Sequence, residues 1–363
     1  MRLLVGRSRE LVEHGLRVPA QVLRVVGAAE VALQLGELGV RVVFEQDGDG
    51  RRLASAAMRR LSVVISTFER EAVLTRVLDL LGEQTTGPDA FEVVVAVNAA
   101  QADLAGVERA AAGRPFATRV VQGETVGVSA SRNRGWREAS ESVVLFLGDD
   151  MLPAPDLVER HLAHHTARPE PKIGALGHVR WADELPRTAF MDWLYAGMQF
   201  DFRSIRGDQA AWWHFYACNA SVKRELLERV GGYDETFQWG YEDLDLGLRL
   251  ASLGFQLVYT PEAEVEHLHP PTLEAWQDRM RIVAGAERQF VAKHPHAEAC
   301  FLKRFEQAEA APRAGARGAQ LARLVPLGVP WLGARVHFSA DRWFSQQLAP
   351  SFLQAWREAE PGR

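Results

Sequence analysis

The chain is poor in cysteine, in long apolar runs and in excess positive charge, and each shortage excludes a class of protein. Cys218 and Cys300 are the only two cysteines in 363 residues, so there is no disulfide framework and we expect a protein of the reducing cytoplasm. Asp and Glu (47) outnumber Lys and Arg (42), which gives a formal charge of −5 and argues against a general nucleic-acid binder. No apolar run approaches the ~20 residues of a membrane-spanning helix, and the first residues are too polar for a signal peptide.

Apolar residues are nevertheless plentiful (47%), enough for one large domain with flanking pieces. Residues 1–57 carry no recognisable chemistry, and we expect an N-terminal extension with a helix over 28–38 and a strand over 40–44. Residues 58–296 are expected to form the main domain, and residues 297–363 a helical C-terminal region. We therefore look for chemistry in the central part of the chain.

Strand and helix patterns alternate in this central part. Strands are expected at 61–67, 91–97, 118–122 and 143–147, and helices at 69–83 and 99–112. A β-α-β-α-β order of this kind favours an α/β fold with a doubly wound, mostly parallel sheet and flanking helices. A further strand, expected over 256–259, is assigned to the edge of the sheet.

The strand over 143–147 is the most informative, because Gly148, Asp149 and Asp150 follow it directly. Ligands of open α/β sheets bind at the carboxyl ends of the strands. Two adjacent acids at that edge repel each other, so a positive group should lie beside them. A divalent cation is the simplest candidate, because Asp oxygens suit Mg²⁺ or Mn²⁺. A solvated turn with an Asp helix cap would explain the same residues.

Other short motifs precede and follow this acidic pair in a characteristic order. They are Ser-Thr-Phe-Glu-Arg at 66–70, Ser-Arg-Asn-Arg-Gly at 131–135, Phe-Leu-Gly-Asp-Asp-Met-Leu-Pro at 146–153, Cys-Asn-Ala-Ser at 218–221, Gly-Gly-Tyr-Asp-Glu at 231–235 and Trp-Gly-Tyr-Glu-Asp at 239–243. Together they resemble the family-two glycosyltransferases of the GT-A fold, which are inverting enzymes that use nucleotide-diphosphate sugars. The resemblance covers roughly residues 60–295.

This resemblance implies roles for two groups of side chains. Asp150 and Asp149 would hold Mn²⁺ or Mg²⁺, and His267 would complete the metal site. The pair Glu242 and Asp243 would supply the general base, with Asp243 the better candidate. In the first turn of a helix the helix dipole favours an ionised carboxylate, and such a carboxylate can take a proton from an acceptor hydroxyl. Read from the helix pattern alone, Glu242, Asp243 and Asp245 would merely cap the helix. The apolar stripe of Leu244, Leu248 and Ala251 would then face the core.

The resemblance also implies a donor site. The side chains expected to contact the nucleotide sugar are Ser66, Phe68, Asn98, Arg132 and Asp149. Arg132 would bind phosphate or orient the acidic pair, and Phe68 would pack on the base or in the core. The chain departs from the family at Gly148, where the first Asp of an Asp-x-Asp motif usually stands, and at Asn98, where an Asp commonly contacts the nucleoside.

Three further features leave alternatives open. The aromatic stretch over residues 181–216 suits either sugar stacking or a packed core. His161, His164 and His165 have helical spacing, and we interpret them as a solvated helix face because no carboxylate or Cys motif accompanies them. Basic and apolar residues alternate over 313–326, which fits either an interfacial membrane contact or a helix packed back on the main domain.

The sequence therefore predicts a metal-dependent inverting glycosyltransferase of polysaccharide or glycoconjugate synthesis. A UDP-sugar is the first expectation for the donor, with dTDP- and GDP-sugars as alternatives, and the acceptor would be a glycan, a lipid-linked group or a small molecule. The protein would be cytoplasmic or peripheral at the inner face of the membrane. The rival functions are a catalytically silent sugar-nucleotide or glycan-binding module and a sugar-nucleotide pyrophosphorylase. The latter would want a glycine-rich loop after the first strand, and residues 66–70 contain no glycine.

Overall fold

The chain folds into two compact units, residues 1–59 and 60–363, in a computed structural model. The structure describes residues 60–359 except 102, 326–328 and 330, together with the backbone of three strands before residue 60. These strands, β1 (Val31–Leu35), β2 (Val40–Gln46) and β3 (Arg52–Ala56), form an antiparallel sheet. The strand expected over 40–44 is confirmed. The helix expected over 28–38 is wrong, because its described part pairs along its whole length with β2; residues 1–30 lie outside the described residues.

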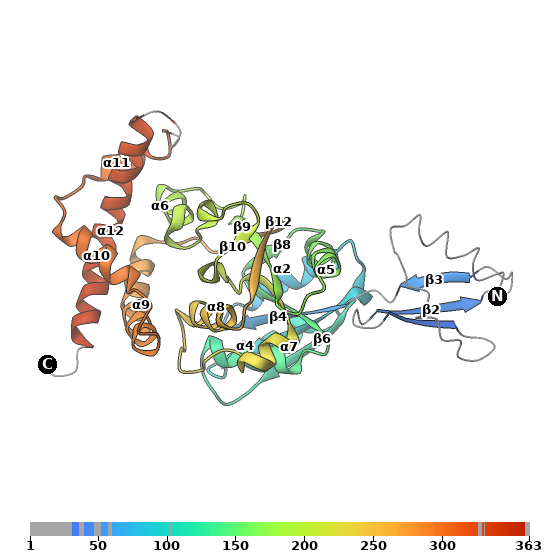
Figure 1. Cartoon of the computed structure of the whole chain (residues 1–363). Helices are drawn as coiled ribbons and strands as arrows, with labels where there is room; N and C mark the ends of the chain where they lie inside the picture. The colour runs from blue at the N-terminus through green and yellow to red at the C-terminus, as the bar shows by residue number, and fades with distance from the viewer. Residues whose placement is uncertain are drawn as a thin grey trace. The chain divides into compact units, whose positions relative to one another are not determined.

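A nine-stranded sheet forms the centre of the second unit (Figure 1). Its parallel half consists of β4 (Leu61–Thr67), β5 (Phe91–Val97), β6 (Ala117–Gln122) and β7 (Val143–Gly148) in the order β7-β4-β5-β6. The inner strands β4, β5 and β7 are buried almost throughout, as expected for strands covered on both faces. The predicted α/β fold is thereby confirmed, and the four strands lie where the sequence placed them.

The other half of the sheet is mixed. It contains β8 (Met151–Pro153), β9 (Ile173–Trp181), β10 (Gln209–Ala210), β11 (Asn219–Lys223) and β12 (Gln256–His267). Strand β11 runs antiparallel between β7 and β9, and β12 lies between β9 on one side and β8 and β10 on the other. The prediction of an edge strand over 256–259 is therefore wrong, because β10 covers that edge.

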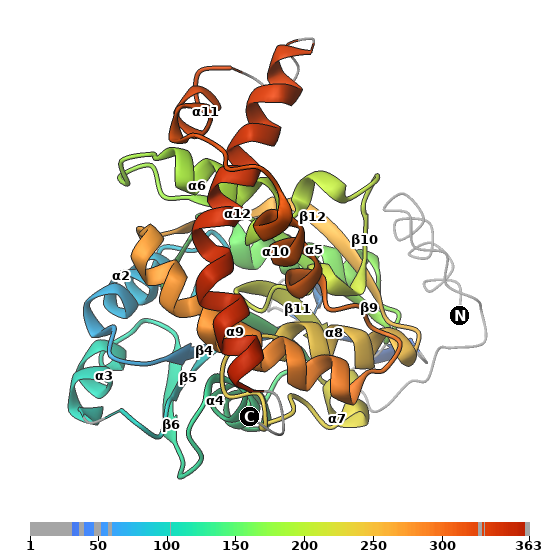
Figure 2. The same ribbon diagram turned by 90° about the vertical axis from the view of Figure 1, so that its left-hand side faces the viewer.

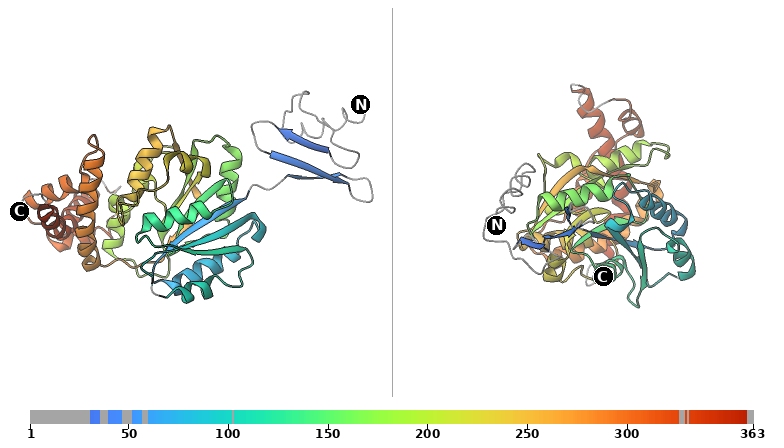
Figure 3. Two further views of the ribbon diagram at one scale, coloured as in Figure 1. Left: turned by 90° about the horizontal axis from the view of Figure 1, so that it is seen from below. Right: turned by 90° about the vertical axis from the view of Figure 1, so that its right-hand side faces the viewer.

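Helices lie on both sides of the strands (Figure 3). The helical segments are α2 (Glu71–Gly82), η2 (Pro88–Ala90), α3 (Leu104–Ala111), α4 (Val128–Glu138), α5 (Leu157–Ala167), α6 (Ala189–Trp193), η3 (Leu194–Met198), η4 (Phe202–Ser204), η5 (Trp212–His214), α7 (Arg224–Val230), α8 (Glu242–Ser252), α9 (Leu273–Lys293), α10 (Cys300–Ala310), α11 (Ala316–Leu321) and α12 (Leu332–Glu358). Helix α4 packs on β4 and β5, and α5 packs on β9 and β12. No helix among the described residues is both long enough and apolar enough to cross a membrane.

The C-terminal helices pack back on the main domain through a second apolar core (Figure 2). Helix α12 contacts α9, α10, α11 and α6. The Phe344 ring centroid lies 5.1 Å from that of Trp193 and 5.3 Å from that of Phe190, and all three side chains are buried. Most of the aromatic stretch over 181–216 is thus core, although Trp213 stays 46% exposed.

The three histidines of α5 are buried, so the solvated helix face expected for them is wrong. His161 reaches Ser221 Oγ through Nδ1 at 2.8 Å and Asn219 Oδ1 through Nε2 at 3.0 Å. Strand β11 supplies these polar partners, so the ring nitrogens can be buried without leaving a hydrogen bond unmade. Burial lowers the pKa of His161 to about 4, and this ring is neutral at physiological pH.

Helix α8 also presents a different face to the core than expected. Leu244, Leu248 and Ala251 are half-buried, whereas Leu246 and Leu250 are fully buried. The physical reason is Asp245, which is fully buried. It forms ion pairs with Arg249 Nε at 2.8 Å and Lys293 Nζ at 2.7 Å and a hydrogen bond with His294 Nε2 at 2.8 Å, so Lys293 and His294 hold the Asp245 face of α8 against the end of α9.

Candidate functional site

The acidic pair lies at the carboxyl edge of the parallel strands, as the sequence predicted. Ser66 pairs with Gly148 in the β4–β7 register, so the chain beyond β4 runs beside Asp149 and Asp150. The hydroxyl of Thr67 donates a 2.8 Å hydrogen bond to Asp149 Oδ2. Both acids are buried. Their position is set by the register of two buried strands and not by a mobile loop.

Arg70 supplies the positive charge that two adjacent buried acids require. One nitrogen, Nη1, lies 2.5 Å from Asp150 Oδ2 and 3.2 Å from Asp149 Oδ1. No separate role was expected for Arg70 from the sequence. The available signal was its place three residues beyond the end of β4, at the same sheet edge as the acids.

His267 approaches the same acids from the opposite half of the sheet. Strand β8 begins directly after Asp150, and its first residue, Met151, pairs with His267 of β12. This register brings His267 Nε2 to 3.4 Å from Asp150 Oδ2. The ring stacks on Trp181, with centroids 5.0 Å apart and planes 15° apart. Its Nδ1 is buried and has no hydrogen-bond partner among the described residues.

The two acids of this pair differ in proton affinity. Burial and the neighbouring Asp150 raise the pKa of Asp149 to about 6, despite Arg70. Burial acts on Asp150 as well, but its hydrogen bond to His267 and the charges of His267 and Arg70 outweigh it, and the pKa of Asp150 is lowered. Asp150 is therefore the firmly ionised member of the pair.

The chemical types of the donor atoms at this edge suit a divalent cation. Carboxylate oxygens together with an imidazole favour Mn²⁺ over Mg²⁺, and Asp149, Asp150 and His267 could supply them. No group of three or more His, Cys, Asp or Glu side chains among the described residues is arranged as a metal site. A side chain in place of Gly148 could not supply a further metal ligand without displacing its neighbours. Its Cβ would lie 2.8 Å from Met151 Cγ and 3.1 Å from Asp150 Oδ1.

A second acidic pair, Glu242 and Asp243, begins α8. Arg132 of α4 holds both, with Nη1 2.9 Å from Glu242 Oε1 and 3.0 Å from Asp243 Oδ1. The expectation that Arg132 orients the first acidic pair is wrong, because its guanidinium lies at the second pair. The backbone N–H of Ala217 donates to Asp243 Oδ2 at 3.1 Å. Burial raises the pKa of Asp243 to about 6, against the charge of Arg132.

Two consecutive residues before β11 connect the two acidic pairs. Ala217 donates its N–H to Asp243, and the carbonyl oxygen of Cys218 accepts from Gly148 N at 3.2 Å. The segment therefore contacts Asp243 through Ala217, and it contacts the residue before Asp149 through Cys218. On one side of the segment an ionised acid lies beside cations, and on the other side lies a carboxylate with a pKa near neutrality. The cations can bind an anion, and the carboxylate can remove a proton.

The start of α8 is held by the C-terminal helices. Gly240 and Tyr241 both have positive φ (83° and 65°), and for Tyr241 this left-handed conformation is strained. The hydroxyl of Tyr241 donates to Glu287 of α9. Glu287 is fully buried and also accepts from the backbone N–H groups of Phe301 (2.7 Å) and Leu302 (2.9 Å) at the start of α10. This carboxylate thus ties the strained turn before Glu242 to the C-terminal region.

Arg279 is a functional candidate that the sequence analysis missed. Its guanidinium carbon lies 4.3 Å from the ring centroid of Trp239 and 4.7 Å from that of Trp276. Within the described part of the chain it makes no hydrogen bond or ion pair. Burial lowers the pKa of Arg279 to about 10, although the charges of Glu242 and Asp150 act to raise it. A guanidinium held between two rings and lacking an anion is suited to bind one.

The remaining predicted donor contacts lie near the same edge. Phe68 follows β4 and is 41% exposed, so it is available for a ligand and is not core. Asn98 follows β5, and its Oδ1 accepts from the backbone N–H of Ala100 at 3.1 Å and of Gly127 at 3.4 Å. Ser66 is half-buried opposite Gly148. The backbone N–H of Asn98 also donates to the carbonyl oxygen of Thr67 at 3.0 Å, so Asn98 lies at the end of β4 beside Phe68.

Comparison with known proteins identifies the family of this chain. Residues 59–283 match the family described as Glycosyltransferase like family 2. Two validoxylamine A glucosyltransferases, from Streptomyces hygroscopicus subsp. limoneus and subsp. jinggangensis, are 33% and 32% identical to the chain over an alignment of 269 residues. The alignments cover 67% of this chain and 58% and 63% of those proteins. The chain therefore spans about six tenths of the length of these relatives.

Among solved structures, a mannosyltransferase from Pyrobaculum calidifontis, in complex with GDP-Man and Mn²⁺, is similar with a TM-score of 0.56 and 20% identity. The similarity covers 84% of this chain and 89% of that one, and it confirms the GT-A fold. The family match covers more than half of the chain, at the residues that build the two acidic pairs. The chain belongs to the family-two glycosyltransferases.

Proposed function

We propose that this protein is a metal-dependent, inverting glycosyltransferase that moves a sugar from a nucleotide-diphosphate donor to a hydroxyl group. One observation carries the proposal: a buried acidic pair with cationic neighbours and a base-like carboxylate lie on either side of one backbone segment, Ala217–Cys218. Family membership supports the reaction class. The names of the two glucosyltransferases support a hexosyl donor.

The diphosphate end of the donor would lie at the first acidic pair. Asp150 and Asp149, with His267, would hold a divalent cation, which when bound neutralises phosphate charge. The ligand types support this assignment, and a protein of the same fold holds GDP-Man and Mn²⁺. Arg70 now occupies the space between the two carboxylates, and in the loaded enzyme its guanidinium would turn to phosphate.

Arg279 would bind the sugar-bearing phosphate of the donor. The charges of Glu242 and Asp150 both act to raise the pKa of Arg279, which supports a place for it near both acidic pairs. The rings of Trp239 and Trp276 lie against the guanidinium carbon, and the N–H groups make no hydrogen bond among the described residues, so they can bind oxygen atoms. As the bond between the anomeric carbon and the phosphate oxygen breaks, this cation stabilises the negative charge that develops on the leaving diphosphate.

Asp243 would act as the general base. The acceptor oxygen attacks the anomeric carbon, its proton passes to an Asp243 carboxylate oxygen, and the diphosphate leaves from the opposite side, so the configuration inverts. A pKa of about 6 suits this role, because the carboxylate is ionised at neutral pH yet basic enough to accept a proton. Arg132 keeps Asp243 in place and limits the rise of its pKa, and Glu242 shares that cation.

The donor nucleotide, the acceptor and the cellular place follow from weaker signals. We retain a UDP-sugar as first expectation, with Ser66, Phe68 and Asn98 near the nucleoside. The acceptor would be a glycan, a lipid-linked group or a small molecule in polysaccharide or glycoconjugate synthesis, in the cytoplasm. Residues 58–296 would carry the chemistry.

The direct test is a thermal-shift screen of UDP-, dTDP- and GDP-sugars with and without Mn²⁺, followed by donor hydrolysis with the best binder. We expect one nucleotide class to raise the melting temperature only with the metal, and slow release of the nucleoside diphosphate. Binding without hydrolysis or transfer would instead indicate a silent binding module. If none of the three nucleotide classes bound, the result would contradict the proposal.

A further inference from the structure

The end of the C-terminal region carries a cluster of exposed apolar side chains. Six of the eleven large hydrophobic side chains that are exposed in the described chain lie between residues 321 and 338, and we call them the tip patch: Leu321 (47% exposed), Leu324 (77%), Val329 (37%), Trp331 (73%), Leu332 (38%) and Phe338 (66%). Helix α11 and the start of α12 project beyond α6 (Figure 2). Exposed apolar clusters of this kind usually mark surfaces that contact another protein or a membrane.

The first turns of α12 are apolar on two sides. Val336, Ala340 and Phe344 face inward and are buried in the second core. Leu332 and Phe338 are exposed on another side, together with Arg335. The core therefore accounts for only one apolar face. On the other face, the Phe338 ring centroid lies 5.7 Å from the guanidinium carbon of Arg342 in the same helix, and the ring stays 66% exposed.

The charge of this segment is of one sign. Residues 313–340 contain Arg313, Arg317, Arg323 and Arg335 but no Asp or Glu, in a chain whose overall charge is −5. Arginines interleaved with Leu, Phe and Trp are typical of segments that lie in the interface of a membrane carrying anionic lipids.

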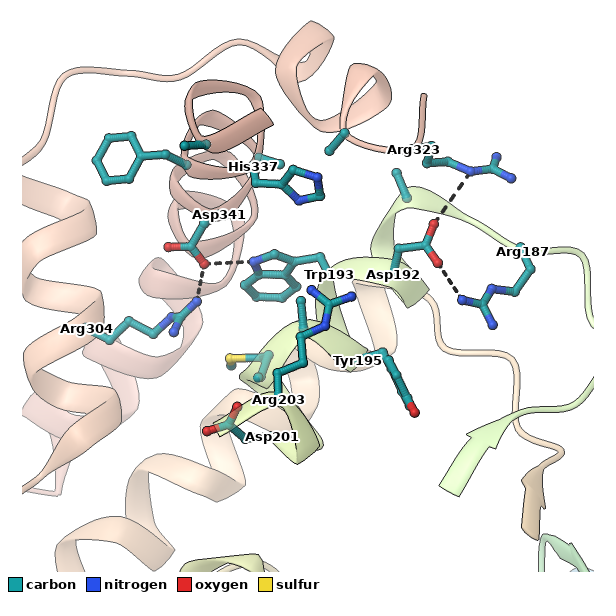
Figure 4. Close-up of a pocket in the computed structure, with 18 residues that line it drawn as sticks. Arg187, Asp192, Trp193, Tyr195, Asp201, Arg203, Arg304, Arg323, His337 and Asp341 are labelled. Carbon is teal, nitrogen blue, oxygen red and sulfur yellow. Dashed lines mark hydrogen bonds and ion pairs between the residues drawn. The ribbon is translucent and has the colours of Figure 1, made fainter. Parts of the chain in front are cut away.

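A pocket with several cations opens beside the tip patch, and Arg323, His337 and Phe338 line it (Figure 4). Its volume is about 820 Å³. The charged side chains that line it are Arg187, Arg203, Arg304 and Arg323, against Asp192, Asp201 and Asp341. Asp192 is shared by Arg187 (2.7 Å) and Arg323 (3.8 Å), whereas Arg203 has no ion pair with any described residue. The pocket therefore contains a guanidinium without a carboxylate partner among the described residues.

We propose that the tip patch docks on a bilayer that contains anionic lipids, with its apolar side chains in the interface and its arginines at the headgroups. A second copy of the chain fits less well, because a two-fold contact of the patch with itself would bring two acid-free arginine segments together. The surface shares no residue with the two acidic pairs, so it acts in localisation and not in chemistry.

The test is vesicle co-sedimentation of the full chain, with phosphatidylcholine alone and with equal parts of phosphatidylcholine and phosphatidylglycerol. We expect binding to the anionic vesicles that weakens as salt rises. The triple variant Leu324→Ser, Trp331→Ser, Phe338→Ser should lower the partition constant about ten-fold or more. Arg317→Gln and Arg335→Gln should each lower it about five-fold. The control Ile282→Ser removes an apolar side chain that is 54% exposed outside the patch, and it should bind as the wild type does.

Light scattering of the same proteins decides the alternative. Equal vesicle binding by the wild type and the triple variant, or no binding by the wild type, would overturn the proposal. A wild-type dimer that the triple variant converts to a monomer, without vesicle binding, would assign the patch to a second copy instead. Unchanged circular dichroism in the variants shows that the loss is local, and nucleotide binding in the thermal-shift assay reports on the enzyme site independently.

Discussion

Replacing Asp243 by Asn removes the proposed base while it keeps the size of the side chain. The carboxylate contacts Arg132 at 3.0 Å and the N–H of Ala217 at 3.1 Å, and an amide oxygen can retain one of these hydrogen bonds. General base catalysis contributes roughly 10²- to 10⁴-fold. We therefore expect glycosyl transfer to fall by about that factor, with nucleotide binding near normal, measured as product formation and by calorimetry.

The pH dependence gives a second readout of the same residue. With a pKa of about 6, Asp243 should lose its base function as pH falls below about 6, and the transfer rate should fall with it. Arg132 opposes the rise of this pKa, so Arg132→Gln should move the acid limb of the rate profile to higher pH. In Asp243→Asn the residual rate should lack this limb.

The raised pKa also predicts a sign for stability. A carboxyl group whose folded pKa lies above its unfolded value of 3.8 favours folding below that value, and this contribution is lost as pH rises through about 6. A shift of this size corresponds to roughly 3 kcal/mol. At pH 7 the uncharged Asn should therefore not lower the melting temperature, and a clear decrease would contradict the assigned direction of the shift.

Glu242→Gln is the matched control for Asp243→Asn, because Glu242 and Asp243 share Arg132. We expect Glu242→Gln to lose less activity. An inactive Glu242→Gln with a normally active Asp243→Asn would exchange the two roles. If both variants transferred normally, the pair would be a helix cap and the mechanism would be wrong.

Three further predictions concern other parts of the chain. Arg279→Gln should weaken binding of a nucleoside diphosphate by about ten-fold while binding of the nucleoside changes little, as an anion contact of roughly 1.5 kcal/mol requires; equal losses for both ligands would argue for a structural role. Asp245→Asn should lower the free energy of unfolding by about 3 to 5 kcal/mol in chemical denaturation, because Lys293 and Arg249 lose a fully buried partner; a stable variant would refute its anchoring role. A chain that begins at Met58 should keep donor hydrolysis if it folds, and folded but inactive protein would show that residues 1–57 complete the site.

The sheet and the position of the acids could be predicted because both depend on short-range patterns. Runs such as Val143–Leu147 are apolar without a break, and the polar residues that follow them collect at one edge whatever the rest of the chain does. The Glu242–Asp243 pair was found for the same reason, at the start of a helix that the local sequence defines.

The features that were missed depend on partners far away in the sequence. His161 and His165 of α5 are polar side chains, but they can be buried because Ser221 and Asn219 of β11 form hydrogen bonds with their ring nitrogens. Helix α8 turns the charged Asp245 inward because Lys293, the last residue of α9, and His294, which follows it, contact the Asp245 carboxylate. Arg279 is one of several arginines in a helical pattern, and only the fold places it between Trp239 and Trp276.

The most direct test of the account is calorimetric titration of a nucleoside diphosphate into the wild type and Asp150→Asn, each with and without Mn²⁺. Asp150 is the ionised acid of the first pair and touches both Arg70 and His267. We predict that Mn²⁺ strengthens binding to the wild type and has no effect on Asp150→Asn, whose circular dichroism should be unchanged. Equal metal-dependent affinities for the two proteins would contradict the proposed metal and donor site.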